Sequence, residues 1–137
     1  RSRGLGDVYK RQVLEIPSIK LKRGILDIDN KYNKAKYNIE LIKEKDDIIV
    51  LASHNGNNYN SYFGNLKNIS LGDTINYYYD GKIYKYIYTD SYDIKKDGYA
   101  DIYRKKGNKC IVLVTCKDGR NDGQTVFIGY LDEILEY

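Results

Sequence analysis

The segment TINYYYDGKIYKYIYTDSYDI, residues 74–94, constrains the fold more than any other part of the chain. Two runs rich in tyrosine and isoleucine flank Asp80-Gly81, a dipeptide that strongly favours a two-residue β-hairpin turn. Tyrosine suits half-buried sheet positions, where the ring packs and the hydroxyl stays in contact with water. The sequence therefore predicts an antiparallel hairpin with one packed and one wet face.

Further short strands are predicted on both sides of this hairpin. Residues 13–28 resemble two strands around the single proline, 48–53 and 109–116 are apolar runs typical of buried strands, and 124–134 form a last strand. Seven or eight strands with short turns in 137 residues are typical of a barrel. We expect a mainly β fold, a closed or nearly closed β-barrel of about eight strands with one or two short helices.

Two segments carry helical signals. Residues 33–47 have apolar side chains at three- to four-residue spacing, and Asn33 would cap the amino terminus of a short amphipathic helix. The residues at that spacing are Ala35, Ile39 and Ile42. A weaker helical turn is predicted around Phe63 and Leu66.

The first twelve residues differ from the rest in charge and pattern. They hold +3 of the total charge of +4, from four basic residues and one acidic residue, namely Arg1, Arg3, Lys10, Arg11 and Asp7. They resemble translated sequencing-adapter read-through, so we expect 1–12 to be a non-native leader and 13–137 to be one domain. Without the leader there is little positive excess, and no nucleic-acid partner is expected.

The two cysteines, Cys110 and Cys116, lie six residues apart. On an extended strand that spacing corresponds to roughly 20 Å at about 3.3 Å per residue. A disulfide needs Cα atoms within about 7 Å, so we expect no bond between them. One histidine and no dense carboxylate loop leave too few ligands for zinc or calcium, so no metal or other cofactor is expected.

The lone His54 and Cys116 occupy equivalent places in the pattern. Each follows an apolar strand and precedes a polar loop that contains glycine. If both strands run in the same direction within one sheet, the thiol and the imidazole lie at the same edge, as a cysteine nucleophile and its acid/base partner do. The alternative is a packed thiol and an incidental loop histidine, which residue types and pattern alone favour.

Four segments of the chain resemble those of the sortases, the cysteine transpeptidases of Gram-positive cell surfaces. In chain order they are EIPSIKL (15–21), LASHNG (51–56), SYFGNLKNISLGDTI (61–75) and LVTC (113–116). They occur in the family's order and at its spacing, including the 62 positions from residue 54 to residue 116. The resemblance extends from residue 13 to about residue 134.

The resemblance implies a site on the barrel rim that binds an LPxTG-like sorting signal near the C-terminus of a surface or pilin protein. Cys116 would attack the carbonyl of the signal's threonine to form a thioester, and His54 would protonate the leaving amine. An amine of a peptidoglycan precursor or a pilin lysine would then resolve the thioester. The expected location is the extracellular face of a Gram-positive membrane, through an N-terminal anchor absent from this fragment.

The third catalytic residue is the point at which the sequence departs from the family pattern. The family's arginine lies at or just before the strand that follows the cysteine, where this chain has Gln124. Arg120 lies four residues earlier, and we expect it to stabilise the oxyanion because glutamine brings no charge. Ser53, Thr115 and Gln124 are expected to contact substrate, although Thr115 also suits a plain strand end.

Two other functions remain open from the sequence. The alternation of tyrosine with lysine in 76–88 is compatible with a non-catalytic barrel that binds sugar, peptide or nucleic acid through its tyrosines. A hydrolytic cysteine peptidase, which transfers the acyl group to water, would need the same nucleophile.

Overall fold

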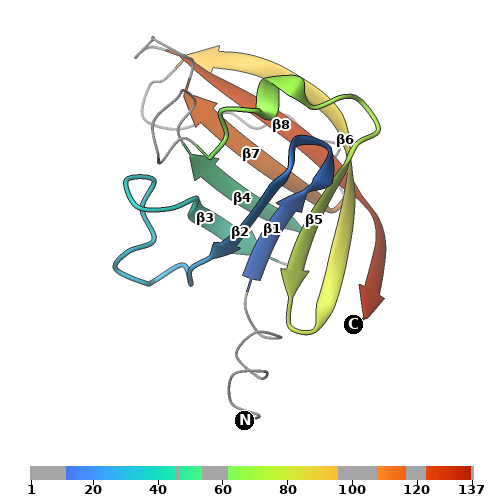
Figure 1. Ribbon diagram of the computed structural model, residues 1–137, viewed down its shortest axis with the longest axis horizontal. Coiled ribbons are helices and arrows are strands. Elements are labelled where there is room, and N and C mark those ends of the chain that lie inside the picture. Colours follow the sequence, from blue (N-terminus) through green and yellow to red (C-terminus); the bar gives the residue numbers. More distant parts are fainter. Residues whose placement is uncertain (1–11, 46, 54–61, 96–107, 117–122, 137) are drawn as a thin grey trace.

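The computed structural model of the chain describes residues 12–45, 47–53, 62–95, 108–116 and 123–136. Within these residues, eight strands form one sheet that curls into a nearly closed barrel, as predicted (Figure 1). The strands are β1 (Gln12–Ile16), β2 (Leu21–Ile25), β3 (Glu40–Lys45), β4 (Ile48–Ser53), β5 (Thr74–Tyr79), β6 (Lys82–Lys95), β7 (Cys110–Cys116) and β8 (Gly123–Glu136). Their order across the sheet is β2-β1-β5-β6-β8-β7-β4-β3, so β2 and β3 are its two edges.

Helical structure in the described ranges is limited to two short 3-10 helices, η1 (Pro17–Ile19) and η2 (Leu66–Asn68). Pro17 separates β1 from β2 as predicted, and η2 falls in the predicted weak helical turn. In the part of the chain that the structure describes, no helix is long and apolar enough to cross a membrane.

The predicted hairpin is formed by β5 and β6. Asp80 and Gly81 have φ of 53° and 76°, the two positive values that a type I′ turn requires. On β5, Ile75 and Tyr77 are buried, whereas the alternate residues Thr74, Asn76 and Tyr78 are only partly buried. The expectation of one packed and one wet face is therefore confirmed.

Strands β4 and β7 are buried on both faces, which explains their continuous apolar sequences. Alternate residues of both strands join the core inside the barrel, for example Leu51 and Leu113. The intervening residues, such as Val50 and Val112, form a second apolar cluster with β8 on the other side of the sheet. Cys110 belongs to this second cluster as a fully buried cysteine that forms no disulfide bond.

The predicted helix over 33–47 is wrong. Residues 31–38 form turns and Glu40–Lys45 form β3, which pairs with β4. The burial of side chains in this segment follows the two-residue period of a strand, since Ile39 and Leu41 are buried. Ile42, which lies at a shift in the β3–β4 pairing register, is 49% exposed. Pairing with a buried neighbouring strand therefore overrides the local helical spacing.

Asn33 caps a strand edge instead of a helix. Its side chain accepts a hydrogen bond from the Leu41 amide at 2.7 Å and donates to the Leu41 and Ile28 carbonyls at 2.9 and 3.1 Å. It thus gives β3 the pairing that a neighbouring strand would give. Asn38 does the same for β2, since it donates to the Gly24 carbonyl at 2.8 Å.

The two edge strands approach each other without a backbone ladder between them in the described residues, and we call this gap the seam. Besides the two asparagines, Glu44 of β3 bridges the seam's interior. It accepts hydrogen bonds from the Gln12 amide at 3.2 and 3.3 Å and from the Tyr77 hydroxyl at 2.8 Å. Burial, followed by the Glu44 charge and hydrogen bond, raises the pKa of Tyr77 far above its ordinary value.

Candidate active site

The parallel pairing of β4 with β7 organises the candidate site. The two strands are in register from Ile48 beside Cys110 to Ser53 beside Thr115, and the other strand pairs described are antiparallel. Their carboxyl ends therefore meet at one end of the barrel, as Figure 1 shows. This confirms the shared strand direction on which the cysteine–histidine hypothesis depends.

Ser53 and Thr115 are neighbours at these strand ends, and both side chains are buried. Their exposed fractions are 3% and 2%. Buried hydroxyl groups are generally satisfied by hydrogen bonds within the protein. Their burial favours a role in positioning the residues that follow them over direct contact with a substrate.

Gln124 lies directly opposite Cys116 in the sheet. The two residues are Cα partners in the antiparallel β7–β8 ladder, and Gln124 is also the partner of Ile94 on β6. Directly opposed residues of antiparallel strands have Cβ atoms about 4.5–5.5 Å apart. Gln124, which is half-buried, is therefore the described polar residue that the sheet brings nearest to the Cys116 position.

A side-chain hydrogen bond next to Gln124 adds to the backbone ladder between β8 and β6. Thr125 donates from its hydroxyl to the Asp93 carboxylate at 2.8 Å, and the two residues are Cα partners. Sequence reasoning missed Asp93, Ile94 and Thr125. Their place beside the site follows only from the cross-strand register, which no local motif encodes.

The remaining predicted site residues lie outside the described structure. His54 and Arg120 fall in the undescribed ranges 54–61 and 117–122, and only the backbone of Cys116 is described. His54 directly follows Ser53 in the chain, and Cys116 directly follows Thr115. In the described residues, no group of three or more His, Cys, Asp or Glu side chains is placed to hold a metal ion.

The comparison with protein families settles which kind of barrel this is. The family model of the sortase domain matches residues 14–131. The chain belongs to the sortase family. No curated protein matches the sequence of this sortase.

Solved sortase structures share the fold of this sortase at low sequence identity. Listeria monocytogenes sortase A has a TM-score of 0.77 and 19% identity, with 94% of this chain and 91% of that chain covered. Streptococcus agalactiae sortase C1, in complex with MTSET, has a TM-score of 0.75 and 20% identity, with 95% and 73% covered. The Clostridium perfringens sortase D5 transpeptidase has a TM-score of 0.73 and 16% identity, with 90% and 79% covered.

Proposed function

We propose that this sortase is a cysteine transpeptidase whose nucleophile is Cys116 and whose acid is His54. One observation carries the proposal. The parallel β4–β7 register sets Ser53 beside Thr115. The residues that follow them in the sequence, His54 and Cys116, therefore start from adjacent strand ends. The cysteine–histidine pair that the sequence predicts would thus emerge from two neighbouring strand ends.

In the first half-reaction, the Cys116 thiolate attacks the threonine carbonyl carbon of an LPxTG-like signal. A carbon–sulfur bond forms, and the carbonyl electrons move to the oxygen of a tetrahedral intermediate. When the carbonyl reforms, the carbon–nitrogen bond to the next residue breaks and His54 gives its proton to the leaving amine. The product is a thioester between the surface or pilin protein and Cys116.

In the second half-reaction, an amine attacks the thioester. A carbon–nitrogen bond forms, the carbon–sulfur bond breaks, and the amine's proton returns to His54 while the thiolate is regenerated. A peptidoglycan precursor or a pilin lysine would supply the amine. If water enters instead, the outcome is hydrolysis, so the acceptor distinguishes a transpeptidase from a peptidase.

The oxyanion needs donors that are in place before the reaction. We assign the cationic donor to Arg120, three residues before β8 in the sequence, because a guanidinium is always charged and offers several N–H groups. Gln124 would add a neutral amide donor from the position opposite Cys116. Ser53 and Thr115 would position the ends of β4 and β7 from within the protein, consistent with their burial.

The tyrosine-based alternative is weakened by the fold. A stacking platform needs exposed rings, and three of the six tyrosines in 76–88, namely Tyr77, Tyr86 and Tyr88, are instead buried in the barrel core at 1%, 4% and 7% exposure. No second function is therefore proposed. As a sortase, the protein would act at the surface of a Gram-positive bacterium. Residues 1–12 remain predicted as a non-native leader, although Gln12, at the end of that segment, lies in β1 and pairs with Ile25.

The test combines a labelling experiment with an acyl-transfer assay. Brief iodoacetamide treatment should alkylate Cys116 while Cys110, which is fully buried, stays protected. With an LPxTG-type peptide, mass spectrometry should detect a thioester on the wild-type chain, and an added oligoglycine should convert it to a new amide. Cys116→Ala should abolish both products and Cys110→Ala should retain them. Preferential labelling of Cys110 would contradict the proposal.

A further inference from the structure

The segment between β2 and β3, residues 26–38, forms one wall of an open cavity beside β2 (Figure 1). The cavity has a volume of about 790 Å³, large enough for a small organic ligand. Charged, amide and tyrosine side chains line it, among them Lys22, Arg23, Asp27, Asn38, Tyr32 and Tyr37. No described residue that lines it belongs to β4 or β7, whose carboxyl ends carry the candidate active site.

Arg23 is held beside the cavity by two contacts. Its Nε donates a hydrogen bond to Asn38 Oδ1 at 2.6 Å, and its guanidinium carbon lies 4.3 Å from the centroid of the Tyr62 ring. Asn38 is only 6% exposed, and its amide nitrogen donates to the Gly24 carbonyl at 2.8 Å, so the acceptor of Arg23 is itself fixed. A buried amide therefore orients an exposed guanidinium.

The N–H groups at the end of the Arg23 side chain remain available. A guanidinium offers several donors, and in the described residues only the Nε–H of Arg23 has an acceptor. Arg23 also makes no ion pair with a carboxylate that the structure describes. An arginine that is already fixed in place can bind an oxyanion with its paired terminal N–H groups, because little side-chain entropy remains to be lost.

Two lysines of the same region are held against tyrosine rings. The ammonium of Lys22 lies 5.6 Å from the centroid of the Tyr78 ring, and that of Lys31 lies 5.0 Å from the centroid of the Tyr32 ring. A cation–π contact positions an ammonium without neutralising its charge. Neither lysine forms an ion pair within the part of the chain that the structure describes, so both add to the positive potential beside Arg23.

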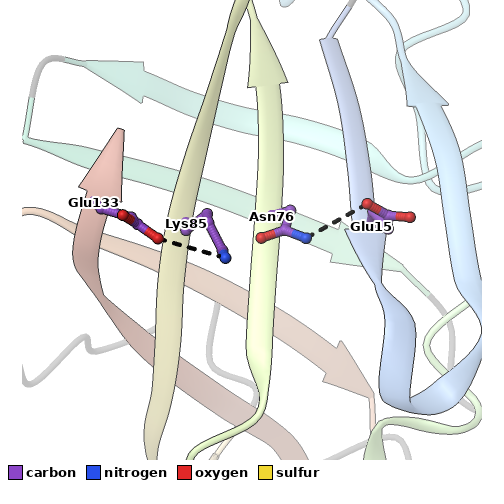
Figure 2. Close-up of polar contacts among 4 residues, drawn as sticks. All are labelled: Glu15, Asn76, Lys85 and Glu133. Atoms are coloured by element: carbon purple, nitrogen blue, oxygen red, sulfur yellow. Dashed lines mark hydrogen bonds and ion pairs between the residues drawn. The ribbon is translucent and has the colours of Figure 1, made fainter. Parts of the chain in front are cut away.

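The charge of the chain is uneven in the same sense. Residues 20–38 contain six basic and two acidic residues, a net charge of +4. Residues 13–137 total +1, because the first twelve residues hold +3 of the +4, so the rest of 13–137 carries −3. On β6, by contrast, Lys85 lies 3.5 Å from the carboxylate of Glu133, as Figure 2 shows. Positive potential is therefore concentrated around the cavity.

A phosphate ester suits these cations better than a carboxylate does. A phosphomonoester carries a charge of about −1.5 to −2 at pH 7 and three acceptor oxygens, which can engage Arg23 and a lysine together. A carboxylate brings a single charge and two oxygens. The number and arrangement of the cations therefore favour phosphate.

The cavity is larger than a phosphate group alone requires. Tyr32 and Tyr37, which line it, are 51% and 49% exposed, so their rings offer an apolar surface against which a sugar ring can pack. The Asp27 carboxylate in the same lining can accept hydrogen bonds from sugar hydroxyls. A bare anion would leave both features unused.

We propose that the cavity beside β2 is a binding site for a phosphorylated sugar, with the phosphate on Arg23 and the sugar ring against Tyr32 and Tyr37. A lipid headgroup can supply the same phosphate chemistry, but the tyrosine and Asp27 contacts favour a free sugar phosphate. The proposal does not rest on the proposed function, because the described lining lies on strands other than β4 and β7 and the test measures binding alone.

Isothermal titration calorimetry of the full chain with glucose 1-phosphate tests the site. Glucose and inorganic phosphate should each bind at least about tenfold more weakly, since each makes only part of the contacts. Arg23→Ala should weaken the binding of glucose 1-phosphate by about tenfold or more, and Arg23→Lys should restore it only in part. Lys85→Ala is the matched control, because it removes one positive charge at a residue that does not line the cavity, and it should bind as the wild type does.

Tyr37→Ala separates ligand binding from the support of Arg23, because it leaves the Asn38 and Tyr62 contacts of Arg23 in place. It should weaken the binding of glucose 1-phosphate and leave that of inorganic phosphate unchanged. A wild type that does not bind glucose 1-phosphate, an equal loss in Lys85→Ala, or an unchanged affinity in both Arg23→Ala and Tyr37→Ala would each overturn the proposal. Binding to phosphatidylglycerol vesicles without binding to glucose 1-phosphate would also overturn it, in favour of a headgroup site.

Discussion

The parallel pair β4–β7 and the seam are built in opposite ways. The pair has a continuous backbone ladder, apolar residues on both faces, and the candidate site at its carboxyl ends. The seam has no ladder between β2 and β3 in the described residues and depends on the side chains of Asn33, Asn38 and Glu44. The nucleophile would therefore extend from a strand pair with a backbone ladder and apolar packing on both faces, whereas the seam joins its two strands by side-chain hydrogen bonds.

This difference separates rate from stability. His54 and Arg120 are proposed to act on the substrate, so we expect their loss to slow the reaction and to leave the free energy of unfolding nearly unchanged. The seam's polar side chains bond to the two edge strands, and β4 separates β3 from β7, so we expect their loss to lower stability more than the rate of the reaction. The predictions below test that separation.

The largest expected effect is on the rate, at Arg120. Removing one oxyanion donor typically costs about 10²–10³ in kcat. We expect Arg120→Ala to lower turnover by that order with an unchanged unfolding midpoint, Arg120→Lys to restore it only in part, and Gln124→Ala to cost about tenfold. Steady-state transpeptidation and thermal unfolding measure the two quantities. A tolerant Arg120 with a crippled Gln124 would assign the donor role to Gln124 instead.

The next effect is on stability, inside the parallel pair. Leu113 is fully buried in the barrel core two residues before Thr115. We expect Leu113→Ala to lower the free energy of unfolding by about 3 kcal/mol through the lost apolar contact and the cavity left behind. Urea unfolding with an unchanged m-value is the measurement. A loss below about 1 kcal/mol would show that this pair is less tightly packed than its burial indicates.

A smaller loss is expected at the seam. Asn33→Ala removes one acceptor and two donations at a side chain that is 5% exposed, and it leaves the Leu41 amide and carbonyl unpaired. We expect the free energy of unfolding to fall by about 2 kcal/mol, with turnover at 20 °C near that of the wild type. Asn30→Ala is the matched control, because Asn30 accepts one bond from the Tyr32 amide on the exposed surface. Equal effects at the two asparagines would refute the closing role of Asn33.

The smallest effect, and one that depends on pH, is expected at Tyr77. Its folded pKa is raised by burial and by Glu44, so the unfolded chain ionises first as pH rises above about 10 and stability then falls. We expect Tyr77→Phe to cost about 1 kcal/mol at pH 7 through the lost hydrogen bond to Glu44. The difference from the wild type should shrink above about pH 10, because phenylalanine has no proton to lose. Tyr37→Phe, at an exposed ring, should show neither change.

Much of the architecture could be predicted from the sequence because the signals are local. Asp80-Gly81 specifies its turn through backbone geometry, and the apolar runs of β4 and β7 specify burial on both faces. The segment 33–47 could not be predicted in this way, because helical spacing and strand alternation coexist there. Only the presence of β4 as a pairing partner selects the strand.

The sequence by itself determined the family, most of the strands but not β3, and the identities of the proposed nucleophile and acid, because these lie in short motifs whose chemistry is carried by residue type. The tertiary structure decided what lies beside what. In the folded barrel, Gln124 lies opposite Cys116, and the Asn33 side chain bonds to the edge of β3. Glu15, Asn76 and Lys85 are aligned across three strands. Such neighbours are tens of residues apart in the chain, and their register is fixed by hydrogen bonds between strands that no local pattern encodes.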